Sequence, residues 1–257
     1  MQTTTDVIVL TEGDYKVLDE DDFGVPGLVA HEWVGPFVDV EAIGPLIMVH
    51  DGIFDPRMGI GHHPHRFNER LFYILEGAVD HDDMLNGIQG HMGTGDLGRL
   101  TEGARGMLHQ EWNNTDGRAR AFILVYTTDP VPPRASFAAL RDGEAPRYDE
   151  APGIHTKELV GPKADLPLHG DVRLFTDTTI DPGAEMTFEL HSGEGALLFP
   201  LDGEVDVDGE RLRPEAMALF PPRDGERRIA AGSAAGARVL RATFGPGHGL
   251  IARSFGR

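Results

Sequence analysis

Short runs of Val, Ile, Leu and Phe recur along the chain, and turn residues separate them. Glycine occurs 33 times and proline 18 times, with turn signals such as Asn86-Gly87 and Asp208-Gly209 between the apolar runs. This punctuation is typical of strands joined by tight turns and predicts an all-β protein with minor helix. The predicted strands are Leu28 to Trp33, Pro45 to His50, Arg70 to Leu75, Ala119 to Tyr126, Met186 to Leu190, Glu204 to Val207 and Val239 to Phe244.

The stretch from Asp129 to Pro167 interrupts this pattern. It begins Asp-Pro-Val-Pro-Pro, contains three further Ala-Pro or Gly-Pro pairs and shows no sustained period of two. Such composition favours a connection rather than a lobe of its own. We therefore expect a proline-rich inter-lobe connection over residues 131–168, with a helical turn around Ser136 to Leu140.

An internal repeat indicates what this connection joins. Leu75-Glu-Gly-Ala-Val-Asp80 matches Leu201-Asp-Gly-Glu-Val-Asp206 at an offset of 126 residues, and each copy follows an apolar run. A glycine turn between paired strands is needed at both places. The repeat predicts duplication of a small β-barrel, with one lobe over residues 1–130 and a second over residues 169–257.

Charge and cysteine content narrow the function classes. The 257 residues carry 42 Asp and Glu against 23 Lys and Arg, a net charge of −19, which disfavours direct binding to nucleic acid or to a membrane surface. The chain has no cysteine, so a metal would have to be held by imidazole and carboxylate groups. Without an 18-residue apolar run or a secretory signal pattern, we expect a cytoplasmic protein.

Two pairs of side chains have the spacing of ligands on strands. His63 and His65 stand two residues apart, as do His109 and Glu111, and this spacing places both members of a pair on one face of a strand. Two antiparallel strands could then aim all four groups into a barrel. Such a set suits Fe(II), Mn, Ni, Cu or Zn, and the sequence does not choose among them.

A plainer interpretation of the histidines stays open. The chain has 12 His, so one His-x-His pair can be a solvated surface feature. Moving His63 and His65 forward by the repeat offset reaches Glu189 and His191, so we expect no metal site in the second lobe. His81, among acidic residues after the glycine turn, is expected to lie in a solvated loop.

Several blocks of this sequence are similar, in order and spacing, to the signature of the pirin family. The blocks are His63-Pro-His-Arg66, Glu69, Tyr73-Ile-Leu-Glu-Gly77, Gly95-Asp-Leu97 and the run from Thr101 to Glu111. The resemblance implies a bicupin, with two β-barrel lobes of the double-stranded β-helix or jelly-roll kind. It also implies that the N-terminal lobe binds iron or a similar divalent metal through His63, His65, His109 and Glu111.

The resemblance leaves two points in doubt. The general cupin pattern would make Glu69 the carboxylate ligand, whereas the His-x-Glu spacing of pirins favours Glu111 and leaves Glu69 to orient an imidazole. Family members carry Gly-Phe after His-Pro-His-Arg, but Phe67-Asn68 stands here. That departure puts the shape of the pocket mouth, and so the substrate, in question.

The resemblance to pirins also implies an activity. Several pirins cleave flavonols, so we expect a quercetin 2,3-dioxygenase-like oxidoreductase that opens a polyphenol ring with dioxygen, releasing carbon monoxide. Fe(II) is the expected metal, with Mn, Ni, Co, Cu or Zn as alternatives, and Glu111 is the expected general base. The alternative is a metal-bearing regulatory protein whose metal state controls binding to a protein partner. A storage or scaffold bicupin without metal chemistry is a third interpretation.

Overall fold

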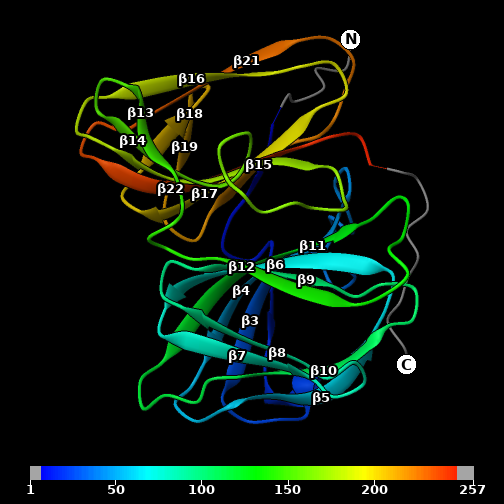
Figure 1. Ribbon diagram of the computed structural model, residues 1–257. Helices are drawn as coiled ribbons and strands as arrows, with labels where there is room; N and C mark the ends of the chain where they lie inside the picture. The colour runs from blue at the N-terminus through cyan, green and yellow to red at the C-terminus, as the bar shows by residue number, and fades with distance from the viewer. Residues whose placement is uncertain (1–6, 248–257) are drawn as a thin grey trace. The chain divides into compact units, whose positions relative to one another are not determined.

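The computed structural model describes residues 7–247, which form two compact units. The N-terminal unit comprises residues 15–144 and 166–170, and the C-terminal unit comprises residues 7–14, 145–165 and 171–247. Strands dominate both units, and within the described range the helix is limited to the single turn α1 (Glu20–Phe23) (Figure 1). The all-β prediction is confirmed.

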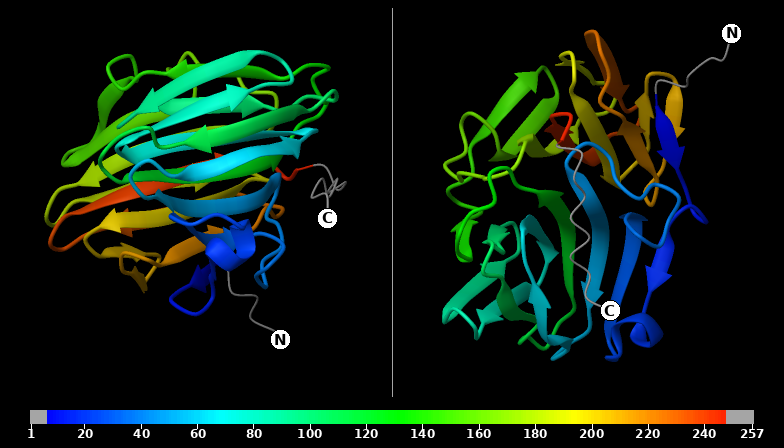
Figure 2. Two further views of the ribbon diagram at one scale, coloured as in Figure 1. Left: turned by 90° about the horizontal axis from the view of Figure 1, so that it is seen from below. Right: turned by 90° about the vertical axis from the view of Figure 1, so that its right-hand side faces the viewer.

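Two antiparallel sheets build the N-terminal unit. The larger sheet has the strand order β12-β9-β6-β11-β4-β3-β2, and its strands β2, β3 and β4 run side by side in Figure 2. The smaller sheet has the order β5-β10-β7-β8. The strands are β2 (Lys16–Leu18), β3 (Leu28–Val34), β4 (Leu46–Phe54), β5 (Gly59–His65), β6 (Asn68–Glu76), β7 (Ala78–Asp83), β8 (Ile88–Gly93), β9 (Leu97–Thr101), β10 (Met107–Trp112), β11 (Ala119–Thr127) and β12 (Ser136–Leu140).

Alternation along the strands decides which side chains enter the core of this unit. In β6, Phe72 and Ile74 pack into an apolar cluster with Val79 of β7 and Met107 of β10. Glu69 and Tyr73, at odd positions of the same strand, lie on its other face because successive side chains of a strand point to opposite sides. The cluster joins both sheets, so strands β5 and β10, which carry His63, His65 and His109, rest on a buried apolar layer.

The C-terminal unit repeats this plan. Its larger sheet has the order β1-β20-β17-β22-β15-β14-β13, and its smaller sheet has the order β16-β21-β18-β19. The interior is a continuous apolar cluster that includes Met186, Leu198, Phe220 and Val239. The strands are β1 (Ile8–Leu10), β13 (Arg147–Ala151), β14 (Ile154–Val160), β15 (Val172–Ile180), β16 (Glu185–Leu190), β17 (Gly195–Asp202), β18 (Val205–Val207), β19 (Glu210–Leu212), β20 (Met217–Phe220), β21 (Arg227–Gly232) and β22 (Ala237–Phe244).

The predicted inter-lobe connection over residues 131–168 is wrong in detail. The expected helical turn at Ser136 to Leu140 is strand β12, which pairs along its whole length with β9 in the N-terminal unit. Strands β13 and β14 also fall in this stretch and belong to the C-terminal unit. Prolines around these strands hid them, because an edge strand needs partners on only one side and tolerates flanking proline.

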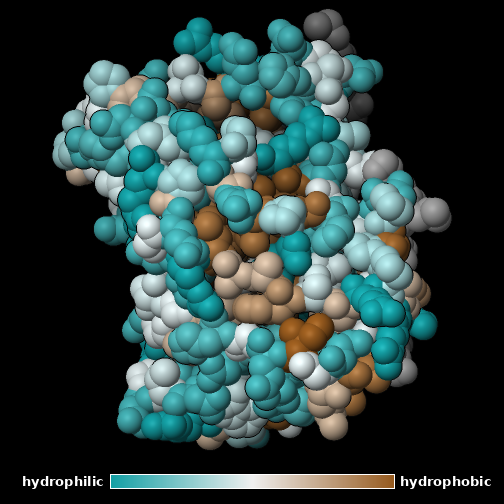
Figure 3. Space-filling view, in the orientation of Figure 1, coloured by the Kyte–Doolittle hydropathy of each residue, from teal (hydrophilic) through white to brown (hydrophobic). Residues whose placement is uncertain are grey.

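The surface matches the acidic composition. Hydrophilic residues cover much of the face shown in Figure 3. Among the described residues, no helix has both the length and the apolar character that crossing a membrane requires.

Candidate metal centre

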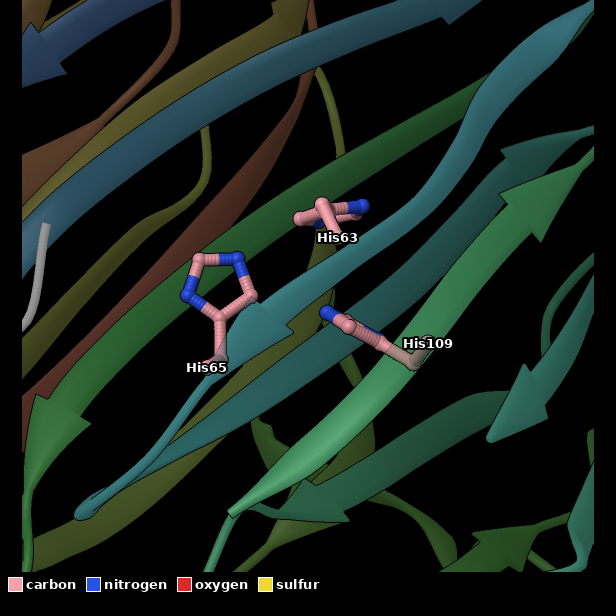
Figure 4. Close-up of side chains that lie close together, drawn as sticks. All are labelled: His63, His65 and His109. Atoms are coloured by element: carbon pink, nitrogen blue, oxygen red, sulfur yellow. The ribbon is translucent and has the colours of Figure 1, made fainter. Parts of the chain in front are cut away.

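Strands β5 and β10 bring three imidazoles together. His63 and His109 are direct partners across the antiparallel ladder, and His65 follows two residues after His63 on the same face of β5. The ring centroid of His63 lies 4.8 Å from that of His65 and 4.5 Å from that of His109. The centroids of His65 and His109 are 5.1 Å apart. In Figure 4 the three rings surround a common space. This convergence is the one that the spacing of these residues predicts.

Glu111 stands next to this group. An extra residue in β5, between Ile60 and His63, shifts the register opposite Gln110, so that Glu111 pairs with Ile60 of β5. Its Oε1 atom lies 2.6 Å from Nδ1 of His109 and 3.1 Å from Nδ1 of His81. The side chains form two overlapping groups with metal-ligand spacing, His63-His65-His109 and His81-His109-Glu111, and His109 belongs to both.

The expectation that His81 lies in a solvated loop is wrong. His81 is 2% exposed and lies in β7, where it is the cross-strand partner of Glu111. Its ring stacks on Phe137 with centroids 5.7 Å apart. The buried residues of β7 alternate, and His81 stands between two of them, Val79 and Asp83. This alternation was the available signal, and the acidic neighbours obscured it.

Burial sets the charge of these groups. Burial lowers the pKa of His63 to about 4, although Glu111 opposes the shift. Burial also lowers the pKa of His65, and the nearby Arg70 lowers it further. For Glu111, burial raises the pKa, but the interactions with His109 and His81 outweigh it and hold the pKa well below its usual range. Near neutral pH His63 and His65 are therefore neutral and Glu111 is ionised, the forms that bind metals.

The residues present fit a single divalent metal. His109 is completely buried, and its Nε2 atom makes no hydrogen bond to any described residue. A buried polar atom without a partner is costly, and a metal would remove that cost. Nδ1 of His63 is held by the carbonyl oxygen of Gly61 at 2.8 Å, which fixes the ring and leaves Nε2 as its free ligand atom.

A cavity of about 220 Å³ opens onto these side chains. His63, His65 and Glu111 form part of its wall, and the remainder is mostly apolar, with Phe54, Phe72 and Ile123 among the lining residues. A concave, mainly apolar space with a few converging polar groups is the usual form of a small-molecule site.

Glu69 does not orient a ligand imidazole, contrary to the expectation for this residue. Its carboxylate accepts hydrogen bonds from the Tyr126 hydroxyl at 2.8 Å and the Thr101 hydroxyl at 2.5 Å. It also accepts one from the backbone of His169 and lies 2.7 Å from Nδ1 of that residue. The alternation of β6 turns Glu69 away from the cavity that Phe72 lines. Glu69 therefore anchors the segment at residues 166–170 within the N-terminal unit.

Phe67 occupies a backbone conformation that favours glycine, with φ of +84°. Hydrogen bonds hold it there: its N–H donates to Gly103 and its carbonyl accepts from the Thr128 hydroxyl. A non-glycine residue in this region is uncommon and costs energy.

Comparison with known proteins places this site in a family. A family model described as Pirin matches residues 23–125, a range that includes His63, His65, His109 and Glu111. A pirin-like protein of Caulobacter vibrioides is 30% identical over 179 residues, covering 66% of this chain and 71% of that protein. The chain belongs to the pirin family.

Solved structures extend the likeness over both units. The bacterial pirin YhhW from Escherichia coli, in complex with nickel(II), superposes with a TM-score of 0.77 at 16% identity and covers 93% of this chain and 99% of its own. A quercetin 2,3-dioxygenase from Acinetobacter baumannii has a TM-score of 0.76 at 20% identity and covers 93% of this chain and 86% of its own. The likeness confirms the bicupin fold that the sequence predicts.

Proposed function

We propose that this pirin is a metal-dependent dioxygenase that opens the ring of a quercetin-like flavonol. One observation carries the proposal: neutral imidazoles and an ionised carboxylate converge on the wall of a mainly apolar cavity. In the reaction both atoms of dioxygen enter the product, and one ring carbon leaves as carbon monoxide.

Under this proposal His63, His65, His109 and Glu111 hold the metal. Fe(II) is the first choice, and Mn, Ni, Co, Cu or Zn would suit the same donors. When bound, such a metal supplies Lewis acidity and a path for an electron between substrate and dioxygen.

The remaining chemistry belongs to side chains of this chain. Glu111 is ionised at neutral pH, so its carboxylate can accept the proton of a substrate hydroxyl group. His81, which does not line this cavity, holds Glu111 through the contact between Nδ1 and Oε1. Phe54, Phe72 and Ile123 keep water from the reacting groups because they line the cavity with apolar surface.

Two solved structures of similar fold support the proposal, one by its bound metal and the other by its named activity. YhhW was solved with nickel(II) bound, and the Acinetobacter baumannii protein is a quercetin 2,3-dioxygenase. Both share the fold of this chain, so a single metal and an aromatic substrate are consistent with its architecture.

The test is turnover of quercetin by protein loaded separately with Fe, Mn, Ni, Co or Cu. Loss of flavonol absorbance together with release of carbon monoxide is the expected result. The His109→Ala variant, loaded in the same way, should give neither signal. Absence of turnover with all five metals would overturn the proposal.

A further inference from the structure

An arginine lies inside the cavity of the N-terminal unit. Arg70 belongs to β6, on the same face as Phe72, and both side chains line the cavity together with His63 and His65. The Arg70 side chain is only 8% exposed. Arginine is almost never buried to this extent without a partner, because the loss of hydration is costly.

Glu102 is that partner, but it engages only part of the guanidinium group. One carboxylate oxygen, Oε1, accepts hydrogen bonds from Nε of Arg70 at 3.1 Å and from Nη2 at 2.6 Å. The other oxygen, Oε2, accepts from the backbone N–H of Asn68 at 3.0 Å. The Nη1 group of Arg70 makes no hydrogen bond to the described part of the chain, so two N–H donors remain unused beside the cavity.

The charge of Arg70 reaches the metal-binding side chains. It is the first cause after burial that lowers the pKa of His65, and it also lowers that of His63. A buried ion pair adds little net stability, since replacing both members with apolar groups is often neutral or favourable. A stabilising role therefore does not explain why an arginine lines this cavity. Binding of an anionic ligand does explain it.

We propose that Arg70 binds the carboxylate of an aromatic acid, with the ring held against the apolar wall of the cavity. The planar donors of a guanidinium group match the two oxygens of a carboxylate better than a single phenolic oxygen. The volume of about 220 Å³ lies below the ~300 Å³ at the lower end of pockets that bury drug-sized ligands, which favours one aromatic ring. This inference concerns the same cavity but goes beyond the proposed function, because a one-ring aromatic acid is a different ligand class from a flavonol.

Benzoate and benzamide test the inference because they share shape and differ in charge. Calorimetric titration of metal-free protein with each compound removes the metal as a competing anion site. We expect the wild-type protein to bind benzoate about 10- to 100-fold more tightly, the range for a hydrogen-bonded charge pair. Equal affinity for the two compounds, or no binding of benzoate, would overturn the inference.

Variants assign the preference to Arg70. Removing Arg70 alone would leave Glu102 buried and charged, so the informative variant is Arg70→Met with Glu102→Gln, which removes both charges. We expect it to lose the preference for benzoate. A matched control is Arg120→Met with Asp51→Asn, which removes both charges of a pair between β11 and β4 that does not line the cavity. A double variant that still prefers benzoate, or a control variant that loses the preference, contradicts the inference.

The outcomes also separate the inference from the proposed dioxygenase. Quercetin turnover by metal-loaded wild type, combined with equal binding of benzoate and benzamide, would reject only the role of Arg70. Arg70-dependent binding of benzoate without turnover by any metal would reject only the dioxygenase.

Discussion

The two units of this pirin have the same strand order but fill their interiors differently. When Asp80 of β7 is aligned with Asp206 of β18, each metal-site position in the N-terminal unit has a counterpart set by cross-strand pairing. In the C-terminal unit all of these counterparts are hydrophobic members of the core or packed against it. The correspondence pairs His63 with Phe188, His65 with Leu190, His81 with Val207, His109 with Ile229 and Glu111 with Ala231.

A second contrast lies in the larger sheets. In the N-terminal unit Tyr126 and Glu69 are cross-strand partners joined by a hydrogen bond. The equivalent pair in the C-terminal unit is Phe244 and Gly195, and a Cβ at Gly195 would lie only 2.5 Å from the Phe244 ring. The same pairing can thus hold either a buried polar network or a close apolar contact. The architecture is therefore independent of the groups that give the first unit its chemistry.

Removing one of the proposed metal-binding side chains of the N-terminal unit should have the largest effect on the difference between the two units. His109→Ala should weaken divalent metal binding by roughly 100-fold or more, because loss of a group that merely orients a ligand already costs about 10–100-fold. Elemental analysis and competition with a chromogenic chelator measure this effect. His191→Ala, an exposed histidine of the C-terminal unit, is the control and should bind as the wild type does. Full metal occupancy in His109→Ala would remove the distinction between the units.

Glu69→Ala should have the next largest effect, on stability rather than on metal. It leaves the buried hydroxyls of Tyr126 and Thr101 without their acceptor, so we expect the free energy of unfolding to fall by about 3–5 kcal/mol. Urea denaturation of the metal-free protein measures it. Tyr126→Phe removes one bond and should cost about 1–3 kcal/mol. A loss below that of Tyr126→Phe would show that Glu69 does not anchor the segment at residues 166–170.

His81→Phe tests whether this position matters for the metal. The ring should still stack on Phe137, but the contact with Glu111 is lost. We expect metal affinity to fall by about 10–100-fold while the fold is retained. The comparison variant is His62→Phe, since His62 lies on the outer face against Asp82. Equal affinities for His81→Phe and wild type would contradict the role of His81.

Phe67→Gly should have the smallest effect, because it tests a difference at one backbone position between the two units. Phe67 has φ of +84°, and its counterpart by the repeat offset, Gly193, has φ of +82°. A left-handed conformation costs a non-glycine residue about 1–2 kcal/mol, and glycine loses about 0.5–1 kcal/mol of chain entropy, so the variant should gain up to about 1.5 kcal/mol. Thermal denaturation checks the sign, and Phe67→Ala should not show the gain. A destabilised Phe67→Gly would mean that the Phe67 side chain outweighs the strain.

Much of the fold follows from local patterns in the sequence. The predicted strand Ala119 to Tyr126 lies within β11, and Met186 to Leu190 lies within β16, because buried strands carry dense apolar residues between glycine turns. Strand β12 was missed because it is only five residues long, contains two alanines, which favour helix, and follows a proline-rich stretch. Counting by the repeat offset was also wrong: it moves His63 to Glu189, whereas the extra residue in β5 between Ile60 and His63 makes Phe188 the structural counterpart.

Only the part of the candidate site that depends on alternation along a strand could be predicted from the sequence. His63, His65 and His109 converge as their alternation requires. Arg70 and His81 could not be assigned in this way, because their importance comes from neighbours distant in sequence, Glu102 and Glu111. Glu69 is the opposite case. It has the spacing of a cupin metal ligand, yet its carboxylate binds the segment at residues 166–170 instead. Long-range partners, rather than local pattern, decide these roles.

Strand β1 has a consequence for how the protein is made. Residues 8–10 are synthesised long before their partner strand β20 at residues 217–220, so this edge of the sheet stays open until β20 has been made. A gene fragment that begins at residue 169 would expose the β20 edge to pairing with other chains. A fragment that ends at residue 130 would leave Glu69 without His169. The halves are therefore poor candidates for separate expression, and a circular permutant that joins β1 directly to the C-terminal unit is the sounder route to an autonomous lobe.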